Sequence, residues 1–232
     1  MDIERDAILG LFKFKKLSSK CTWSNDVYST KIKNLEILVA CSGVGITNAA
    51  LTTAFIAKKK KLDGVISLGV AGALSPQLLI GDLVVCEKII QHDCIRSFDE
   101  GIELMKPGSL HLSLSKEQRP DPIYSSSQEL TELFKPQKCL LIYGSIVSGN
   151  EFVGSKSKKI ELASKYDAFV VDMESAGVAQ VTQALNLPLA VFKTIADSIH
   201  ENLSSESLYK DFKEIASRNA SQVVKCFLEK QL

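Results

Sequence analysis

The stretch VVDMESA at residues 170–176 decides the fold and the place of its chemistry. Its apolar start predicts a buried β-strand, and a helical pattern follows from Glu174. The stretch VFKTIAD at residues 191–197 is also an apolar β-type run, and it ends on Asp197. In an open α/β sheet, ligands bind at the carboxyl ends of the strands. Two carboxylates that neighbouring strands bring to one crevice indicate acid–base chemistry on a small molecule.

Outward from these strands, short apolar segments alternate with helical patterns. Near-continuous runs of Val, Ile and Leu are typical of strands covered on both faces. We expect strands at 36–42, 64–70, 82–86, 139–147, 168–173 and 189–195, and helices at 47–60, 157–165, 174–185 and 207–229. The alternation predicts a single α/β domain over residues 1–232, with a central mixed β-sheet flanked by helices.

The least regular stretch covers residues 94–127. It contains Pro107, Gly108, Pro120 and Pro122. We expect it to form a long excursion that covers the site or a subunit interface.

Charge and composition exclude several classes of protein. The net charge is +1, with 45% apolar and 24% charged residues, which argues against a nucleic-acid or membrane-surface protein. We expect no signal peptide, since the first residues lack its pattern, and no apolar run is long enough to span a bilayer. The six cysteines lack C-x-x-C spacing and the three histidines are scattered, which argues against a disulfide framework or a metal site. Reduced thiols in the cytoplasm are the prediction.

Two glycine turns follow neighbouring predicted strands, SGVG at 42–45 and GVAG at 69–72. Glycine lets backbone amides approach a ligand, and a helix N-terminus favours an anionic or hydroxyl-rich group. Either turn alone is equally compatible with a tight turn that binds nothing. Together they favour one shared ligand crevice.

These features together resemble the nucleoside phosphorylase/hydrolase superfamily. The resemblance rests on SGVG at 42–45, GVAGAL at 69–74, IGDLVV at 80–85, SGNEF at 148–152, DMESA at 172–176 and Asp197. Within this superfamily, the chain is most similar to the 5′-methylthioadenosine/S-adenosylhomocysteine nucleosidases. The most specific evidence for the resemblance is the DMES sequence at 172–175 together with its distance from Asp197. The glycine turns only support it.

The resemblance implies a nucleoside phosphorylase-like fold and hydrolysis of the N-glycosidic bond of methylthioadenosine or S-adenosylhomocysteine. The products would be adenine and a thioribose. Adenine leaves readily only when protonated, and Asp197 matches the family's acid at purine N7, where burial favours a protonated carboxyl. Glu174 matches the carboxylate that orients the ribose hydroxyls and stabilises the oxocarbenium-like charge.

The resemblance also implies substrate contacts. Met173 would pack beneath the sugar, Phe152 would stack on the base, and the backbone of Val153 would read the edge of the base. Tyr209 would cover the ribose, and the first glycine turn would bring Val44 to the nucleoside. The partners implied are a small-molecule nucleoside and a second copy of the chain in a homodimer, with no metal and no organic cofactor.

Water is the predicted nucleophile. Phosphorolytic relatives hold phosphate with an Arg and a Ser around the second glycine turn, where this chain has Ser67 and Val70. A phosphate bound there would lack its charge-assisted partner. Val70 also stands where bacterial nucleosidases have a Ser near the water. Lys193 stands where many of them have an Arg. Lysine keeps the positive charge but lacks the planar guanidinium group, which can donate two parallel hydrogen bonds.

The start of the chain departs from the family pattern. The family begins with an apolar strand and then an acidic cluster, one Glu of which activates the water. Here the chain begins MDIERDAIL, and aligning Ile8 and Leu9 with the following helix puts Glu4 at the base position, with Asp2 as the substitute. The first strand would then be missing, and we expect Glu4 to be loosely placed.

Each of these residues also has a purely structural interpretation. Glu174 could be a first-turn helix acid with Asp172 as the cap, and Asp197 could form an Asx turn. Met173 and Phe152 could belong to the core. Three functional alternatives stay open: a hydrolase of another 5′-substituted nucleoside of futalosine type, a purine nucleoside phosphorylase, and a nucleoside-binding protein with impaired catalysis.

Overall fold

The computed structural model of the chain describes residues 2–17, 26–110, 114–136, 140–199 and 205–231. Its centre is a six-stranded mixed sheet with the order β11-β4-β10-β9-β5-β8. Its strands are β4 (Val65–Ala73), β5 (Leu83–Gln91), β8 (Ile123–Ser125), β9 (Leu141–Ser148), β10 (Val170–Asp172) and β11 (Leu189–Asp197). Because β11 pairs with β5 as well as with β4, the sheet closes on itself. The predicted α/β class and the mixed sheet are confirmed.

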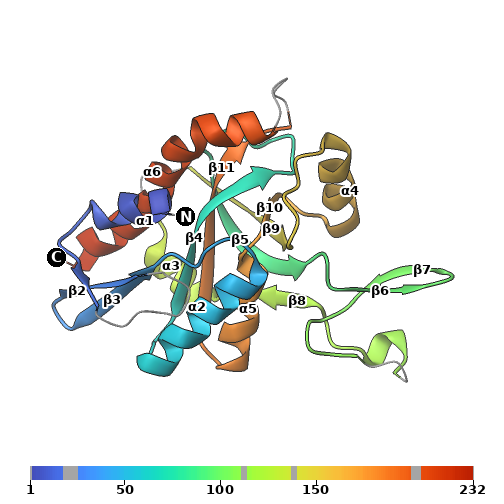
Figure 1. The fold of residues 1–232 in the computed structure, drawn as a ribbon, viewed down its shortest axis with the longest axis horizontal. Coiled ribbons are helices and arrows are strands. Elements are labelled where there is room, and N and C mark those ends of the chain that lie inside the picture. Colours follow the sequence, from blue (N-terminus) through green and yellow to red (C-terminus); the bar gives the residue numbers. More distant parts are fainter. Residues whose placement is uncertain (1, 18–25, 111–113, 137–139, 200–204, 232) are drawn as a thin grey trace.

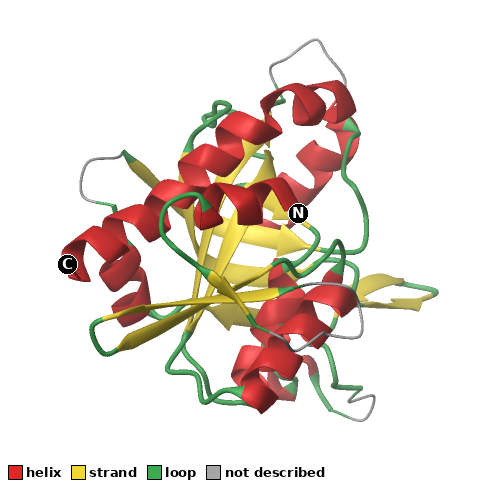
Figure 2. Ribbon diagram, turned by 60° about the vertical axis from the view of Figure 1, so that its left-hand side comes forward, coloured by secondary structure: helices red, strands yellow, loops and turns green. Residues whose placement is uncertain are grey.

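Helices enclose this sheet, as Figure 2 shows. The helices α2 (Ile46–Lys59) and α5 (Ser175–Ala184) lie side by side, and Gly177 allows their close approach, since a Cβ there would lie 2.2 Å from the Ile46 carbonyl oxygen. The long helix α6 (Ser205–Gln231) packs on β11 and β4, and α1 (Asp2–Leu9) packs on α6 (Figure 1). The remaining helices are α3 (Gln128–Phe134), α4 (Lys156–Tyr166) and a 3-10 turn at Lys116–Gln118. No described helix combines the length and apolar character needed to cross a membrane.

The apolar strands build the core that holds the site in place. Side chains of β9 and β11, among them Ile146 and Val191, are completely buried between the sheet and the helices α2 and α5. On the α6 side, Phe192 packs with Val85 and Val223. Five of the six predicted strands therefore belong to the closed sheet, because residues covered on both faces need no polar alternation. The expectation for 36–42 is wrong in part: that segment forms β3 (Leu35–Ala40), which is only partly buried and belongs to a separate sheet.

A second, separate sheet is formed by β1 (Lys15–Lys16), β2 (Val27–Ile32) and β3 (Leu35–Ala40). Among the described residues, β3 forms a ladder with β2 alone, and the 65–70 part of β4 forms one with β11 alone. A cavity of about 730 Å³ lies between β3 and β4, and residues of α2, α3 and α6 also line it. This side of the molecule is therefore less densely built than the closed sheet.

The irregular stretch at 94–127 contains a hairpin of β6 (Ile95–Phe98) and β7 (Gly101–Leu104). The hairpin projects away from the sheet and its helices (Figure 1). None of its described residues lines the crevice discussed below, so within one copy of the chain the excursion does not cover the site.

Candidate active site

The carboxyl ends of β10 and β11 open into a crevice of about 400 Å³. All the predicted site residues whose side chains are described line this crevice: Glu4, Val44, Val70, Phe152, Val153, Met173, Glu174, Lys193 and Asp197. Tyr209 belongs to α6, but its side chain lies outside the described part of the chain. The motifs found in the sequence thus converge on one place.

Glu174 accepts hydrogen bonds from two segments that line the crevice, the first glycine turn and the end of β10. Its Oε1 accepts a hydrogen bond of 3.0 Å from the amide of Gly45, and its Oε2 accepts one of 3.3 Å from the amide of Met173. The next amide along the chain, that of Ile46 at the start of α2, donates to Asn150 Oδ1. We expected the amides at this glycine turn to approach a ligand directly, but these two amides bind side chains of the protein instead.

Burial raises the pKa of Glu174 to about 7, and the charge of Asp172 adds to this rise. The charge of Lys193 and the Gly45 hydrogen bond oppose it. Glu174 therefore changes its charge near neutral pH, a property that clusters at functional sites.

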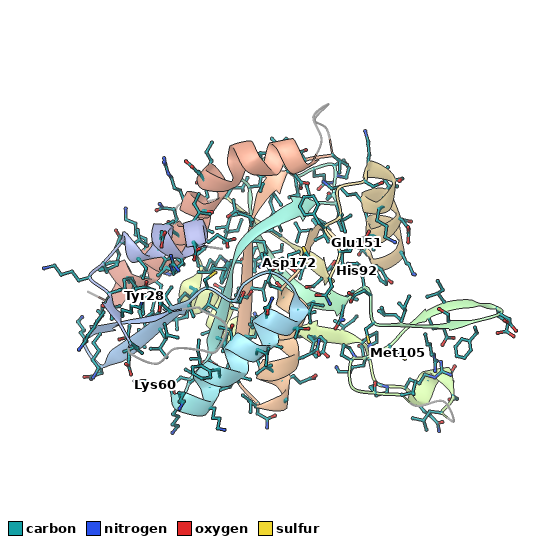
Figure 3. The ribbon with its side chains drawn as sticks, in the orientation of Figure 1. Tyr28, Lys60, His92, Met105, Glu151 and Asp172 are labelled. Carbon is teal, nitrogen blue, oxygen red and sulfur yellow. The ribbon has the colours of Figure 1, made fainter. Side chains whose placement is uncertain are left out.

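Asp172 and Lys193 form a buried ion pair beside Glu174, with Lys193 Nζ 2.8 Å from Asp172 Oδ2. Asp172 lies in the interior of the fold (Figure 3) and also accepts hydrogen bonds from the amide and hydroxyl of Ser175, as a cap of α5 would. Burial opposes the ionisation of Asp172, but Lys193 and Ser175 outweigh it and hold the pKa of Asp172 below its ordinary value. Burial also opposes the charged form of Lys193, but the neighbouring carboxylates outweigh burial and raise the pKa of Lys193. The charge of Lys193 is thus largely engaged with Asp172.

Glu4 reaches the crevice from α1. Its Oε1 accepts a 2.9 Å hydrogen bond from the amide of Val70, in the second glycine turn. A Cβ at Gly69 would lie 2.8 Å from Glu4 Oε1 and 3.6 Å from Lys193 Nζ, so glycine lets both side chains approach β4. The expectation of a loosely placed Glu4 is wrong, because an amide on the outer edge of β4 holds its carboxylate.

Asp197 ends β11, just after a shift in register between β11 and β4. It is 4% exposed, and its Oδ2 lies 2.7 Å from Lys159 Nζ. Its Oδ1 is buried and makes no hydrogen bond within the described part of the chain. A Cβ at Gly72 would lie 2.7 Å from that oxygen, so the second glycine turn makes room for Asp197. One carboxyl oxygen is anchored, and the other is free to meet a ligand.

Lys159, which contacts the crevice residue Asp197, is a polar residue that the sequence analysis missed. It lies on α4 beside Lys158, and composition alone does not separate the two. The available signal was its spacing, because Lys159, Leu162 and Tyr166 share one helical face. Leu162 is buried in the adjacent apolar cluster, with Tyr166 packed against it.

The aromatic and apolar residues of the site are not all core residues. Phe152 is 52% exposed at the rim of the crevice, whereas Val153 behind it is buried. A large exposed aromatic ring beside buried carboxylates is typical of a surface that binds a flat ligand. The described residues hold no cluster of three or more His, Cys, Asp or Glu side chains that is placed to bind a metal.

Comparisons with known proteins agree with this geometry. The family model described as "Phosphorylase superfamily" matches residues 13–229. An aminodeoxyfutalosine nucleosidase of Helicobacter pylori is 30% identical over 197 residues, which cover 84% of this chain and 81% of that protein. A 5′-methylthioadenosine/S-adenosylhomocysteine nucleosidase of Staphylococcus aureus is 27% identical over 202 residues, 87% of this chain and 85% of that one.

Among solved structures, an H. pylori 5′-methylthioadenosine/S-adenosylhomocysteine nucleosidase in complex with an amino-pyrrolopyrimidine compound superposes with a TM-score of 0.81. It is 29% identical, and the match covers 99% of this chain and 95% of that one. The match extends over the closed sheet and both glycine turns. The chain belongs to the phosphorylase superfamily.

Proposed function

We propose that the chain hydrolyses the N-glycosidic bond of a 5′-thio-substituted adenosine, 5′-methylthioadenosine or S-adenosylhomocysteine, and releases adenine and a thioribose. The observation that carries the proposal is the arrangement of Asp197, Glu174 and Glu4 around one crevice of about 400 Å³. Pockets of this size accommodate nucleoside-sized ligands. The names of the H. pylori and S. aureus relatives support the same reaction class.

In the proposed reaction, Asp197 donates a proton to the departing base through its free Oδ1. Glu174 binds the ribose hydroxyls and, as the carboxylate, stabilises the positive charge that develops on the sugar. Glu4 accepts a proton from the attacking water, from its position at the Val70 amide. The acid thus acts on the leaving base, and the general base acts on the attacking water.

The remaining residues would shape the pocket. Phe152 would stack on the base, with the Val153 backbone at the edge of the base, and Met173 would pack beneath the sugar. Val44 and Val70 would border the nucleoside, and Tyr209 would cover the ribose. Lys193 would act mainly by fixing Asp172 and by tuning Glu174.

Water fits the site better than phosphate does. The amide of the second glycine turn at Val70 already binds the carboxylate of Glu4, which would repel a phosphate. The nearest cation, Lys193, is engaged with Asp172. No charge-assisted partner for phosphate is therefore left among the described residues that line the crevice.

A 5′-substituent of futalosine type is the second candidate, because one relative is named an aminodeoxyfutalosine nucleosidase. The pocket for the 5′-group would distinguish the two substrates. We further propose a homodimer through the projecting hairpin, where Phe98 and Ile102 are exposed apolar residues. The free thiols of Cys41, Cys86, Cys94 and Cys226 support a cytoplasmic location.

The test is adenine release from methylthioadenosine by the purified chain, with and without phosphate, and with aminodeoxyfutalosine as a parallel substrate. We expect release that does not depend on phosphate. Release only in the presence of phosphate would identify a phosphorylase. Nucleoside binding without any release would contradict the proposed reaction and favour a binding protein.

A further inference from the structure

Lys159 is a buried lysine that the proposed reaction leaves without a role. It is 1% exposed and belongs to the largest completely buried side chains of the molecule. Lysine is almost never fully buried unless it is paired, because the loss of hydration costs several kcal/mol. Its burial therefore depends on a specific partner.

That partner is the proposed acid. Lys159 Nζ lies 2.7 Å from Asp197 Oδ2, and both side chains are at least 95% buried. The contact joins α4 to the end of β11, across 38 residues of sequence. The helix α4 follows directly on the segment of Phe152 and Val153, so one structural unit carries both the proposed base-binding surface and the anchor of the acid.

The two oxygens of Asp197 are in different situations. Oδ2 is held by the ammonium group of Lys159, while Oδ1 is buried without a hydrogen-bond partner in the described part of the chain. Oδ1 faces the Cα of Gly72, and Asp197 lines the crevice. A carboxyl group held in this way presents one defined oxygen to a ligand.

The charges around Asp197 come from several elements. Gly72 of β4 and Val171 of β10 are uncharged, and α4 contributes Lys159. The crevice also contains the carboxylates of Glu4, Glu151 and Glu174, and the Asp172–Lys193 pair, whose charges compensate each other. Lys159 is the one cation that forms an ion pair with Asp197 in the described structure.

We propose that Lys159 is a positioning residue for Asp197, which fixes Oδ2 and directs Oδ1 toward the base of the bound nucleoside. The inference rests on the proposed function, in which Asp197 donates a proton from Oδ1. Without the contact at Oδ2, the carboxyl group could turn and Oδ1 would no longer be aimed at the base.

Three substitutions distinguish the positioning of Asp197 by Lys159 from a role of Lys159 in packing alone. Lys159→Met removes both charge and donor, Lys159→Gln keeps a donor without charge, and Lys159→Arg keeps the charge. We expect the loss of rate to follow the loss of the donor to Oδ2, so that it is largest in the Met variant, smaller in the Gln variant and smallest in the Arg variant. We expect kcat at the plateau to fall about tenfold in the Met variant, with KM changing less.

The arginine variant should keep a kcat near that of the wild type, because it retains a charged donor for Oδ2 of Asp197. Lys158→Met is the matched control, since Lys158 is the neighbour on α4 and its ammonium contacts Glu161 instead. A kcat of Lys159→Met that stays at the wild-type value, or that falls no more than the kcat of Lys158→Met, would overturn the inference.

A double-mutant cycle tests the pair without any turnover. The variants are Lys159→Met, Asp197→Asn and the double variant, and the readout is the urea midpoint of unfolding. If the pair acts as a unit, Lys159→Met lowers the midpoint clearly less in the Asp197→Asn background. Additive shifts would show that the two residues do not interact and would overturn the inference. A wild-type chain that releases no adenine, with a coupled cycle, would instead refute the proposed function and leave the ion pair standing.

Discussion

The side of the crevice that holds the proposed acid and the side that holds the proposed base are built differently, and we call them the acid side and the base side. On the acid side, Asp172 and Asp197 stand at the ends of β10 and β11, which flank β4 in the closed sheet, and each carboxylate has a buried lysine as its partner. On the base side, Glu4 stands on α1, a helix with no buried residue, and binds the outer edge of β4 next to a cavity of about 730 Å³. The closed sheet thus fixes the proposed acid, while a lightly packed helix carries the proposed base.

This difference has a physical consequence. Residues on the acid side are held by dense packing and ion pairs, so a substitution there disturbs both chemistry and stability. The base side has few buried contacts, so a substitution there should affect chemistry alone. The predictions below test this contrast, starting with the largest effect.

Asp197→Asn should lower the rate of adenine release about 1,000-fold, because the amide cannot donate the proton that general acid catalysis supplies. It should also lower the free energy of unfolding by about 3 kcal/mol, since Lys159 keeps its charge without a counter-ion. Steady-state kinetics and urea unfolding measure the two effects. Asp167→Asn is the control, because Asp167 is exposed in a left-handed conformation at the end of α4 that asparagine also adopts. Undiminished release by Asp197→Asn would refute the acid.

Glu4→Gln should lower the rate about 100-fold, because the base is lost. The free energy of unfolding should stay nearly unchanged, since the glutamine oxygen can still accept the hydrogen bond from Val70. Asp2→Asn serves as the matched control on the same turn, where Asp2 is exposed and pairs with Arg5. A slow Asp2→Asn together with a normal Glu4→Gln would reverse the assignment of the base.

The packing contrast can be measured with one pair of isoleucines. Ile146 on β9 is completely buried, whereas Ile37 on β3 is partly buried and lines the cavity between β3 and β4. Ile146→Ala should cost about 4 kcal/mol in the free energy of unfolding, and Ile37→Ala about 2 kcal/mol less, because Ile37 has fewer contacts to lose. Urea unfolding gives both values. Equal costs would mean that the base side is packed as tightly as the acid side.

The sequence revealed the closed sheet better than its surroundings. Strands such as β9 and β11 were predicted because full burial produces continuous apolar runs. The strand β2, which reads VYSTKI, mixes polar and apolar residues and was missed, as were the short strands of the projecting hairpin. The predicted family and fold class are confirmed.

For the site, the sequence predicted which residues line the crevice, but not how they pair. Lys193 was expected near water or ribose, yet it pairs with Asp172, which also accepts the Ser175 hydrogen bonds of its alternative interpretation as a helix cap. Lys159 meets Asp197 across 38 residues. Such pairs depend on the placement of whole elements, which local patterns do not determine.

A smaller effect is predicted for Glu174, which borders both sides of the crevice. Its pKa in the folded chain is about 7, above the ordinary value of 4.5, mainly because of burial. Between these values the folded state binds more protons than the unfolded state, so stability falls as pH rises. Over the single unit from about pH 5.5 to 6.5, wild type should lose about 1 kcal/mol more than Glu174→Gln, which lacks the titrating group. Parallel slopes in urea unfolding would contradict the raised pKa.

The same titration reports whether Glu4 lies where the structure places it. The charge of Glu4 contributes to the raised pKa of Glu174, although less than burial and Asp172 do. Glu4→Gln should therefore move the pH at which Glu174 ionises slightly downward, and the loss of stability with rising pH should be complete at a lower pH. Asp2→Asn, on the same helix but outside the crevice, should leave that end point unchanged. If Glu4→Gln also leaves it unchanged, α1 does not hold Glu4 close to Glu174 in solution, and the acid side forms independently of the base side.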